Sequence, residues 1–583
     1  MKNYLKNMEM RLSAEEKKLL KLIYEPTVVT IPPSDACRSM CVTSDGEIRI
    51  YGSINKNSPD EAGTLVYISS TDCGLSWKTH LMENDMLGSA GYNFKTGRYI
   101  SCYPDEVRAD LKESFGKSGT WAIINDEGYD GTNNRFIKLS DKFVHVMKLP
   151  FFLESCNRWF IIGEHRYADM SKNIVIFYSD DDGESWTENV IDKTAPMFEI
   201  KPPHKDVRWQ EYSCEPTIAE LSDGELIMLV RTSQNYHYIY RSDDKGKTWS
   251  EPLPSAFHGT ITMPVLHKLS DGRIVLFWCN NQPMPELEHE KAFPPLDNAT
   301  KKGIWEDVFT NRDANHLAIS EDDGKTWTGF RELFLNTIRN NADFRAIGGV
   351  NSRDKSVHQA QILELPYNKL LVHFGQNSIS RKAVILDIDW LYEKERFEDF
   401  RLGLCNVSTH MYVKSNLGGY RGFSGHCAYN RTNGALLIPD PDGNFEEALQ
   451  ICRIEDDRLV YKKQGVVWNF PASQKGRVEI KLRVINSGVA ISLTDHWYNP
   501  CDETVKYESP LSFEYKEVSS KWDIITIEYD TEEMTGNIFV NNELLQKVKI
   551  EAANGLCYLH IQTLAEYEDF EGTLIKTFRK TMI

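Results

Sequence analysis

The chain has 583 residues, more than one hydrophobic core usually holds, which indicates two or three domains. Its formal net charge of −18 at pH 7 is not offset by any basic stretch, so nucleic acid is excluded as an expected partner. No apolar run is long enough to span a membrane, so no membrane partner is expected either.

Residues 1–29 are predicted to form an N-terminal helical segment. Ser13 and Glu16 have the spacing of a capping box at a helix start. The charged stretch before them lacks the apolar core of a secretory signal peptide. The twelve cysteines are scattered, without CxxC pairs or metal-ligand spacing. We therefore expect a cytoplasmic protein with reduced thiols, no cofactor and no metal site.

One eight-residue motif, Ser-x-Asp-x-Gly-x-Ser/Thr-Trp, occurs four times and fixes the architecture. Its aspartate can accept hydrogen bonds from the backbone of a tight turn, and its glycine supplies a positive φ. Its tryptophan is expected to pack back onto the sheet. A repeat at intervals of tens of residues indicates similar stacked units. The four copies, called Asp boxes below, are residues 70–77, 179–186, 242–249 and 320–327.

A second repeat places Asp-Gly between two β-rich runs, which is a strong hairpin signal. One such hairpin and one Asp box make a four-stranded blade, and blades close radially into a propeller. The intervals between boxes are 109, 63 and 78 residues, so the first interval is expected to hold a blade without a box. We predict a six-bladed β-propeller over residues 30–395. The Asp-Gly pairs begin at Asp45, Asp223 and Asp271.

Beyond the propeller we predict a connector over residues 396–414 and a β-sandwich over residues 415–583. The β pattern continues there without Asp boxes. The hairpin from Gly536 to Leu545, with its Asn-Asn turn, resembles those of laminin-G or concanavalin-like jelly rolls. The predicted fold class is therefore all-β, a six-bladed propeller followed by a jelly-roll sandwich. Whether this sandwich binds glycan or only supports the propeller is left open.

The Asp boxes and blade pattern resemble the sialidase superfamily. That family holds a sugar carboxylate with three arginines from different blades, since guanidinium groups pair anions from several directions. By resemblance these are Arg38, Arg231 and Arg312, and Glu215 matches the family's glutamate. The alternative for Glu215 and Arg231 is a plain cross-strand ion pair.

The resemblance also implies a general acid on a loop before the first Asp box. Asp60, or less favourably Glu61, matches that place. The family's nucleophile is a tyrosine near the start of a late blade, and here His358 stands in that position. The propeller scaffold and the three arginines, called the anion clamp below, are thus expected to be retained. The covalent mechanism of sialidases is not expected.

The first function expected is an exo-acting glycosidase that removes an acidic or otherwise non-standard terminal sugar. Its catalytic residues would be Asp60, Glu215 and His358, and Arg38, Arg231 and Arg312 would bind the substrate. A uronate-directed polysaccharide lyase or rhamnosidase-like propeller is the second reading. A non-catalytic glycan-binding propeller is the third. In each case the partner is a glycan or oligosaccharide.

Overall fold

The structure is a computed structural model of the whole chain. Asp60 and Glu61 lie outside the residues that it describes, so their predicted role is not placed. The described ranges are residues 3–34, 36, 38–55, 63–83, 86–104, 119–129, 133–166, 172–199, 213–259, 261–283, 312–334, 356–375, 380–413, 430–443 and 446–583.

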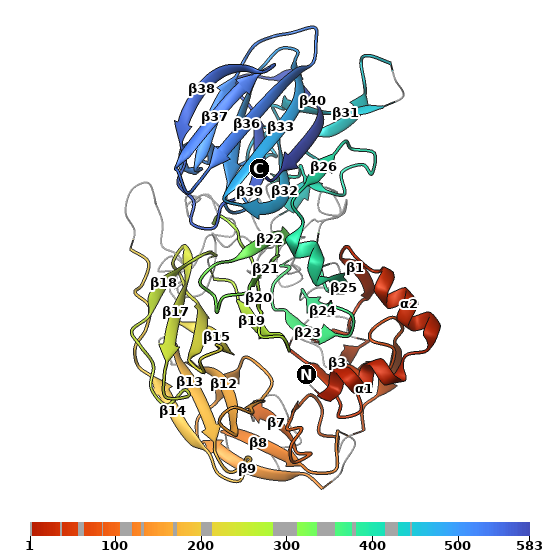
Figure 1. Cartoon of the computed structure of the whole chain (residues 1–583), viewed down its shortest axis with the longest axis vertical. Helices are drawn as coiled ribbons and strands as arrows, with labels where there is room; N and C mark the ends of the chain where they lie inside the picture. Colours follow the sequence, from red (N-terminus) through yellow and green to blue (C-terminus); the bar gives the residue numbers. More distant parts are fainter. Residues whose placement is uncertain are drawn as a thin grey trace.

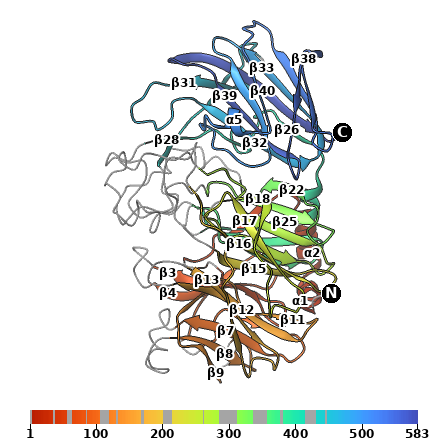
Figure 2. The ribbon, with the colours of Figure 1, turned by 90° about the vertical axis from the view of Figure 1, so that its left-hand side faces the viewer.

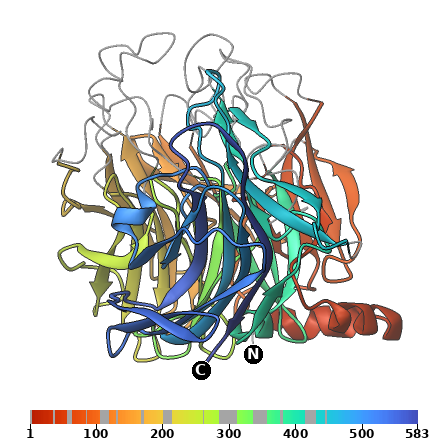
Figure 3. The same cartoon turned by 90° about the horizontal axis from the view of Figure 1, so that it is seen from above.

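Two short helices, α1 (Asn3–Arg11) and α2 (Ala14–Leu22), open the chain. Ser13 caps α2 with both hydrogen bonds of the predicted capping box. Asn7 of α1 donates to the backbone oxygen of Ser44, in the first hairpin of the ring, at 2.7 Å. In Figure 3 these helices (red) lie at the edge of the molecule. Neither they nor another helix in the described ranges could cross a bilayer.

A ring of six antiparallel sheets in the described ranges forms the propeller (Figure 1). The first sheet contains β2 (Met40–Val42), β3 (Ile48–Ile54), β4 (Thr64–Ser70) and β5 (Lys78–Leu81). The second contains β6 (Gly91–Tyr92), β7 (Tyr99–Pro104), β8 (Thr120–Asn125) and β9 (Arg135–Ser140). The third contains β10 (Val144–Val146), β11 (Phe151–Leu153), β12 (Arg158–Arg166), β13 (Lys172–Ser179) and β14 (Thr187–Ile191).

The remaining three sheets complete the ring. The fourth contains β15 (Cys214–Glu220), β16 (Leu226–Arg231), β17 (Tyr236–Ser242) and β18 (Leu253–His258). The fifth contains β19 (Val265–Lys268), β20 (Ile274–Trp278), β21 (His316–Ser320) and β22 (Thr328–Glu332). The sixth contains β23 (Gln361–Leu365), β24 (Lys369–Phe374), β25 (Lys382–Asp387) and the N-terminal strand β1 (Thr27–Thr30).

Strand β1 closes the ring by pairing with β25, Thr27 opposite Ile385. A segment from the start of the chain thus lies in the same sheet as the last three propeller strands. Residues 27–30, although largely expected in the helical segment, pair within the ring. A closed ring leaves only short, protected sheet edges.

Each Asp box connects the last two strands of its sheet, as the box of the third sheet shows. Asp181 accepts from the backbone N–H of Ser185 at 2.8 Å. Gly183 has φ +90°, and its carbonyl accepts from Trp186 Nε1 at 2.9 Å. The second sheet lies in the longest interval between boxes and has no box, as the spacing predicts.

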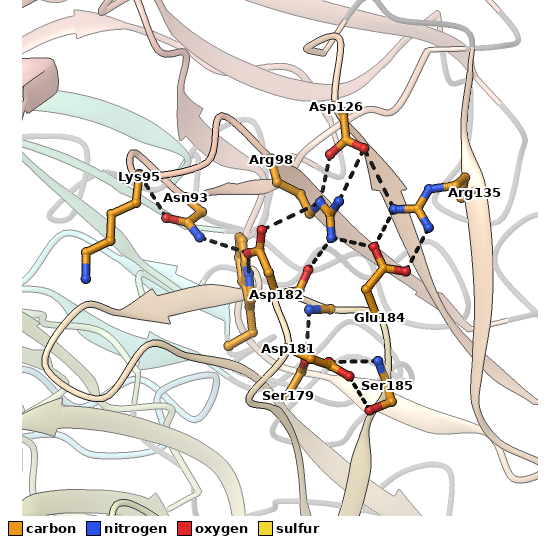
Figure 4. Close-up of polar contacts among 12 residues, drawn as sticks. Asn93, Lys95, Arg98, Asp126, Arg135, Ser179, Asp181, Asp182, Glu184 and Ser185 are labelled. Atoms are coloured by element: carbon orange, nitrogen blue, oxygen red, sulfur yellow. Dashed lines mark hydrogen bonds and ion pairs between the residues drawn. The ribbon is translucent and has the colours of Figure 1, made fainter.

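The same box also binds the neighbouring blade (Figure 4). Arg98 of the second sheet donates to the backbone oxygen of Asp182 at 2.7 Å and to Glu184 at 2.8 Å. Its Nε pairs with Asp126 at 2.7 Å, and Arg135 pairs with Glu184 at 2.9 Å. Asp181 and Asp182 of this turn therefore have a structural role, since their contacts hold the turn and join two blades.

The C-terminal region is a sandwich of two antiparallel sheets in the described residues. One contains β26 (Arg396–Glu398), β30 (Leu436–Pro439), β31 (Glu447–Arg453), β33 (Lys475–Val484), β36 (Asp523–Asp530), β37 (Thr535–Val540), β38 (Glu543–Lys549) and β40 (Asp569–Thr581). The other contains β27 (Val407–Ser408), β32 (Gly465–Ser473), β34 (Val489–Thr494), β35 (Leu511–Tyr515) and β39 (Leu556–Thr563). Strands β26 and β27 lie in the stretch expected as a connector.

Three shorter elements accompany these sheets. A 3-10 helix, η4 (Ile388–Tyr392), follows the last propeller strand. A hairpin of β28 (Met411–Val413) and β29 (Asn430–Thr432) and a short helix, α5 (Val505–Glu508), belong to the C-terminal region.

The sandwich packs on the fourth and fifth sheets of the ring, and both views show it stacked on one side (Figures 1 and 2). Trp278 of β20 lies in one hydrophobic cluster with Trp497 and Tyr558 of the sandwich. Asn469 of β32 accepts from the backbone N–H of Glu332 at 2.9 Å. The hydrophobic cluster around Trp278 and Trp497 holds the ring and the sandwich together, because it removes apolar surface from water.

The buried carboxyl group of Asp502 is expected to make the stability of the sandwich depend on pH. It is 1% exposed, and its Oδ2 has no hydrogen-bond partner in the described ranges. Burial raises the pKa of Asp502 from 3.8 to about 6. The folded state therefore binds the Asp502 proton more tightly than the unfolded state does. As the pH rises from about 4 to about 6, Asp502 loses this proton and its contribution to the free energy of unfolding falls by about 3 kcal/mol.

Asp502→Asn is expected to remove this penalty while it keeps the acceptor for the Thr504 N–H. Thermal unfolding should give the variant a higher midpoint than wild type at about pH 7, and no gain at about pH 4. An equal change at both pH values would contradict the raised pKa.

A candidate active site at one face of the ring

The predicted site residues lie at the same edge of their sheets. In an antiparallel blade the start of the first strand, the end of the second and the start of the third share one edge. Arg38 precedes β2, Glu215 lies at the start of β15, and Arg231 ends β16. Arg312 precedes β21, the third strand of its sheet, and His358 precedes β23. The topology therefore places all five on one face of the ring.

Helix α1 lies on the opposite face, because it contacts the turn at the far end of β2. Arg11 pairs there with Asp45 at 2.6 Å. Figure 2 shows α1 and α2 along one side of the ring. The face that carries the predicted site is thus not covered by these helices.

The backbone is strained where the innermost strands begin on this face. Arg38 (φ +62°), Glu215 (+47°), Ile261 (+52°) and Gln359 (+60°) all have left-handed conformations. Left-handed non-glycine residues are uncommon, and they concentrate at functional sites. Glu215 also lies in a β-bulge, since the pairing of β15 with β16 shifts register between Cys214 and Thr217.

A chain of polar contacts leads from Arg38 to Arg231. Arg38 Nη2 lies 3.4 Å from His145 Nε2, and His145 Nδ1 lies 3.5 Å from Glu164 Oε1. The other oxygen of Glu164 accepts from the backbone N–H of Glu215 at 3.2 Å. Glu215 Oε2 in turn pairs with Arg231 Nη1 at 2.9 Å. We call these five residues the Arg38–Arg231 cluster.

Burial differs along the Arg38–Arg231 cluster. The side chains of Glu215 and Arg231 are 7% and 5% exposed, and Glu164 is 1% exposed. Buried ions must be paired, and Glu164 is also 3.4 Å from Lys172 Nζ. Arg38 is half-buried, and its contacts to His145 and Met147 in the described ranges include no carboxylate. Arg38 is therefore the cation of the cluster best placed to meet an anion.

Arg312 and His358 form a second, adjoining part of this face. Arg312 is 1% exposed and donates from Nη2 to the backbone oxygen of Ile261 at 2.7 Å. Its own backbone oxygen accepts from the N–H of Val357, the residue before His358, at 3.1 Å. His358 is fully buried. Arg312 thus lies beside His358, and convergence of all three arginines on one pocket stays a prediction.

An axial cavity of about 320 Å³ runs between the innermost strands of all six sheets. Arg38 and Met147 line it near the Arg38–Arg231 cluster, and Tyr4 of α1 and Phe94 also line it. A volume near 300 Å³ is at the lower end for small-molecule sites, which are usually apolar with a few convergent polar groups. The cavity inside the ring therefore reaches the predicted site at Arg38.

Buried histidines near this face are held neutral. Burial, with the charge of Arg231 adding to it, lowers the pKa of His237 to about 4. Burial and Arg381 lower the pKa of His373 to about 3. Both rings are therefore uncharged at neutral pH.

Three members of this site were not predicted, namely His145, Glu164 and Lys172, all from the third sheet. His145 and Glu164 lie in strands without a repeated motif, and Lys172 begins β13, whose last residue opens an Asp box. The one available signal was Glu164 itself, a carboxylate that directly follows the apolar run of β12 at residues 159–163. Charged groups are rarely buried beside such runs without a partner.

Comparison with known proteins gives one family match. Residues 126–342 match the model of a BNR repeat-like domain, a segment of less than half of the chain that contains three of the four Asp boxes. No curated protein matches the chain.

Several solved structures resemble the chain at low identity. A mutant of Trypanosoma rangeli sialidase displaying trans-sialidase activity is 12% identical, with a TM-score of 0.36, over 96% of this chain and 95% of its own. A Dyadobacter fermentans protein of unknown function is 15% identical, with a TM-score of 0.38, over 62% of this chain and 97% of its own. TM-scores at this level do not bear on function.

Proposed function

We propose that this chain, a six-bladed propeller of the sialidase-like kind with a BNR repeat-like domain in residues 126–342, acts on glycans. The site is the ring face that carries Arg38, Glu215 and Arg231. In the finer form of the proposal, the chain is an exo-acting glycosidase that removes an acidic or otherwise non-standard terminal sugar. The Arg38–Arg231 cluster carries the proposal.

Arg38 is proposed to bind the anionic group of the sugar. Arg38 is half-buried, it lines the axial cavity, and its contacts to His145 and Met147 bring it no carboxylate partner in the described ranges. An arginine can pair a carboxylate through two parallel hydrogen bonds, which fixes orientation as well as affinity. Arg231 and Arg312 are proposed to complete the clamp from the fourth and fifth sheets.

Glu215 is proposed to transfer a proton. Arg231 and the backbone contact to Glu164 fix its position, and its left-handed backbone in a bulge supports a functional role. Glycoside hydrolysis needs one carboxyl group to protonate the leaving oxygen and a second group to act on the anomeric carbon or on water. Asp60 is proposed as the first of these groups, and Glu215 with His358 as the second.

The test is a panel of labelled sugars incubated with the full chain. It contains sialosides, other acidic glycosides, rhamnosides and uronate oligosaccharides. Release of an acidic terminal sugar is expected, with weak or no cleavage of simple sialosides. An unsaturated product from uronate oligosaccharides would identify a lyase instead, and binding without turnover would identify a glycan-binding propeller.

Arg38→Met tests the anion contact directly. It is expected to lower turnover of the acidic substrate by about 10²-fold, because it truncates one partner of a charge-assisted contact. Arg241→Met is the matched control, since Arg241 lies on the outer part of the fourth sheet and pairs with Glu225 at the surface. Equal activity of Arg38→Met and Arg241→Met would contradict the clamp.

A further inference from the structure

Three side chains that can bind a metal ion meet where the fourth sheet of the ring touches the sandwich. His258 ends β18, and Asp495 and His496 directly follow β34. Their ligand atoms lie within 4.8 Å of one another. His258 Nε2 is 3.4 Å from Asp495 Oδ2, and His496 Nδ1 is 2.6 Å from Asp495 Oδ1. We call these residues the seam triad.

Backbone contacts between the two parts of the chain hold the seam triad in place. Asn280 donates from Nδ2 to the backbone oxygen of Asp495 at 2.9 Å. The backbone oxygen of Asn280 accepts from Trp497 at 2.8 Å, and that of Trp497 accepts from Gln282 at 2.7 Å. Asp495 and His496 are therefore fixed against the ring that supplies His258.

Gln282 determines which nitrogen of His496 carries a proton. The amide of Gln282 donates to Glu508 at 2.9 Å, so its Oε1 faces His496 Nε2 at 2.8 Å. An amide oxygen only accepts, hence His496 Nε2 is the donor. In the neutral ring the lone pair of Nδ1 then points at the Asp495 carboxylate, 2.6 Å away. Two acceptors at that distance repel each other unless a proton or a metal cation lies between them.

The packing of the seam triad brings its ligand atoms together around one carboxylate. The His496 ring is 4% exposed and stacks on that of His258, with ring centroids 3.7 Å apart. The carboxylate of Asp495 lies within reach of both imidazoles. Two imidazoles that converge on one carboxylate are a metal-ligand set.

We propose that the seam triad binds one divalent transition-metal ion, which joins the ring to the sandwich. Two imidazoles and a carboxylate suit Zn²⁺ and related ions, whereas Ca²⁺ and Mg²⁺ prefer oxygen ligands. The side chains of His258 and Asp495 are 17% and 19% exposed, which gives the ion access and leaves room for water. Gln282 acts as a positioning residue through His496.

This site does not depend on the proposed glycan activity. It also differs from the expectation, based on sequence spacing, that the chain has no metal site. His258 and Asp495 are 237 positions apart, so no local ligand spacing marks them.

The test uses the full chain, freed of metal by a chelator, and Zn²⁺ as the probe. One Zn²⁺ per chain is expected to remain after desalting, and the thermal unfolding midpoint should rise with Zn²⁺ but not with Ca²⁺. His258→Gln, His496→Gln and Asp495→Asn should each weaken Zn²⁺ binding by at least about 10²-fold, and Gln282→Met by about 10-fold to 10²-fold. His80→Gln, a histidine of the first sheet outside the triad, is the control and should bind Zn²⁺ as wild type does.

The proposal is overturned if wild type retains no Zn²⁺, or if the three triad variants bind it as tightly as His80→Gln. X-ray absorption of wild type loaded with Zn²⁺ decides the matter without variants. A shell with two imidazole nitrogens supports the seam triad, and a shell with thiolate sulfur or oxygen alone contradicts it.

Discussion

Replacing Asp313 by asparagine is expected to lower the free energy of unfolding by about 3–5 kcal/mol. Asp313 follows Arg312 on the ring and pairs with Arg431 of the β28–β29 hairpin, and it also accepts from the hydroxyl of Tyr412. Asp313 and Arg431 are 4% and 3% exposed. Burial lowers the pKa of Arg431 to about 9, so this guanidinium depends on its carboxylate partner.

A double variant separates the lost charge from lost packing. Asp313→Asn with Arg431→Met removes both ions and is expected to unfold close to wild type, because replacing a whole buried pair is often neutral. Asp456→Asn, which breaks the exposed pair with Arg458, is the control and should change nothing measurable. Urea unfolding checks all three. A double variant as unstable as Asp313→Asn would show that the charge pair is not the cause.

Glu215→Gln is expected to lower turnover by about 10²-fold to 10⁴-fold. The amide keeps the size of the side chain but cannot exchange a proton at neutral pH. Arg231 loses its counter-charge as well, so the unfolding midpoint of the variant is measured beside its rate constants. The loss of kcat should persist at temperatures where the variant is fully folded.

Glu220→Gln is the matched control for this prediction. Glu220 ends the same strand, β15, at the opposite edge of the sheet, and it pairs with Lys245. Its substitution should leave kcat unchanged. Comparable kcat for Glu215→Gln and wild type would remove Glu215 from the reaction and leave only a cross-strand ion pair with Arg231.

The propeller could be predicted because its signals are local and repeated. Each Asp box is a complete turn in eight residues, and each Asp-Gly pair marks the first hairpin of a sheet. The pairing of β1 with β25 gave no such signal, since Thr27–Thr30 is four residues long and its partner is more than 350 positions away. Strands β26 and β27 were missed as part of the sandwich for the same reason.

The part of the site that could be predicted from the sequence is the pair of residues that face each other across one hairpin. Glu215 and Arg231 are 16 positions apart, and their pairing follows from two adjacent strands. His145 and Glu164 are opposite each other on β10 and β12 of the third sheet, but their contacts with Arg38 and Glu215 join neighbouring sheets. The seam triad joins the ring to the sandwich. No spacing in the sequence records these contacts between sheets. Arg312 and the segment before His358 likewise come from different sheets, and the Val357 N–H donates to the Arg312 carbonyl between them.

A crystal structure of the chain with a bound acidic sugar tests the central claim most directly. The carboxylate of the sugar is predicted within hydrogen-bond distance of Arg38, with Arg231 and Arg312 beside it and the glycosidic carbon next to Glu215. A sugar bound elsewhere, with the Arg38–Arg231 cluster unchanged and unoccupied, would contradict the assignment of this face as the active site.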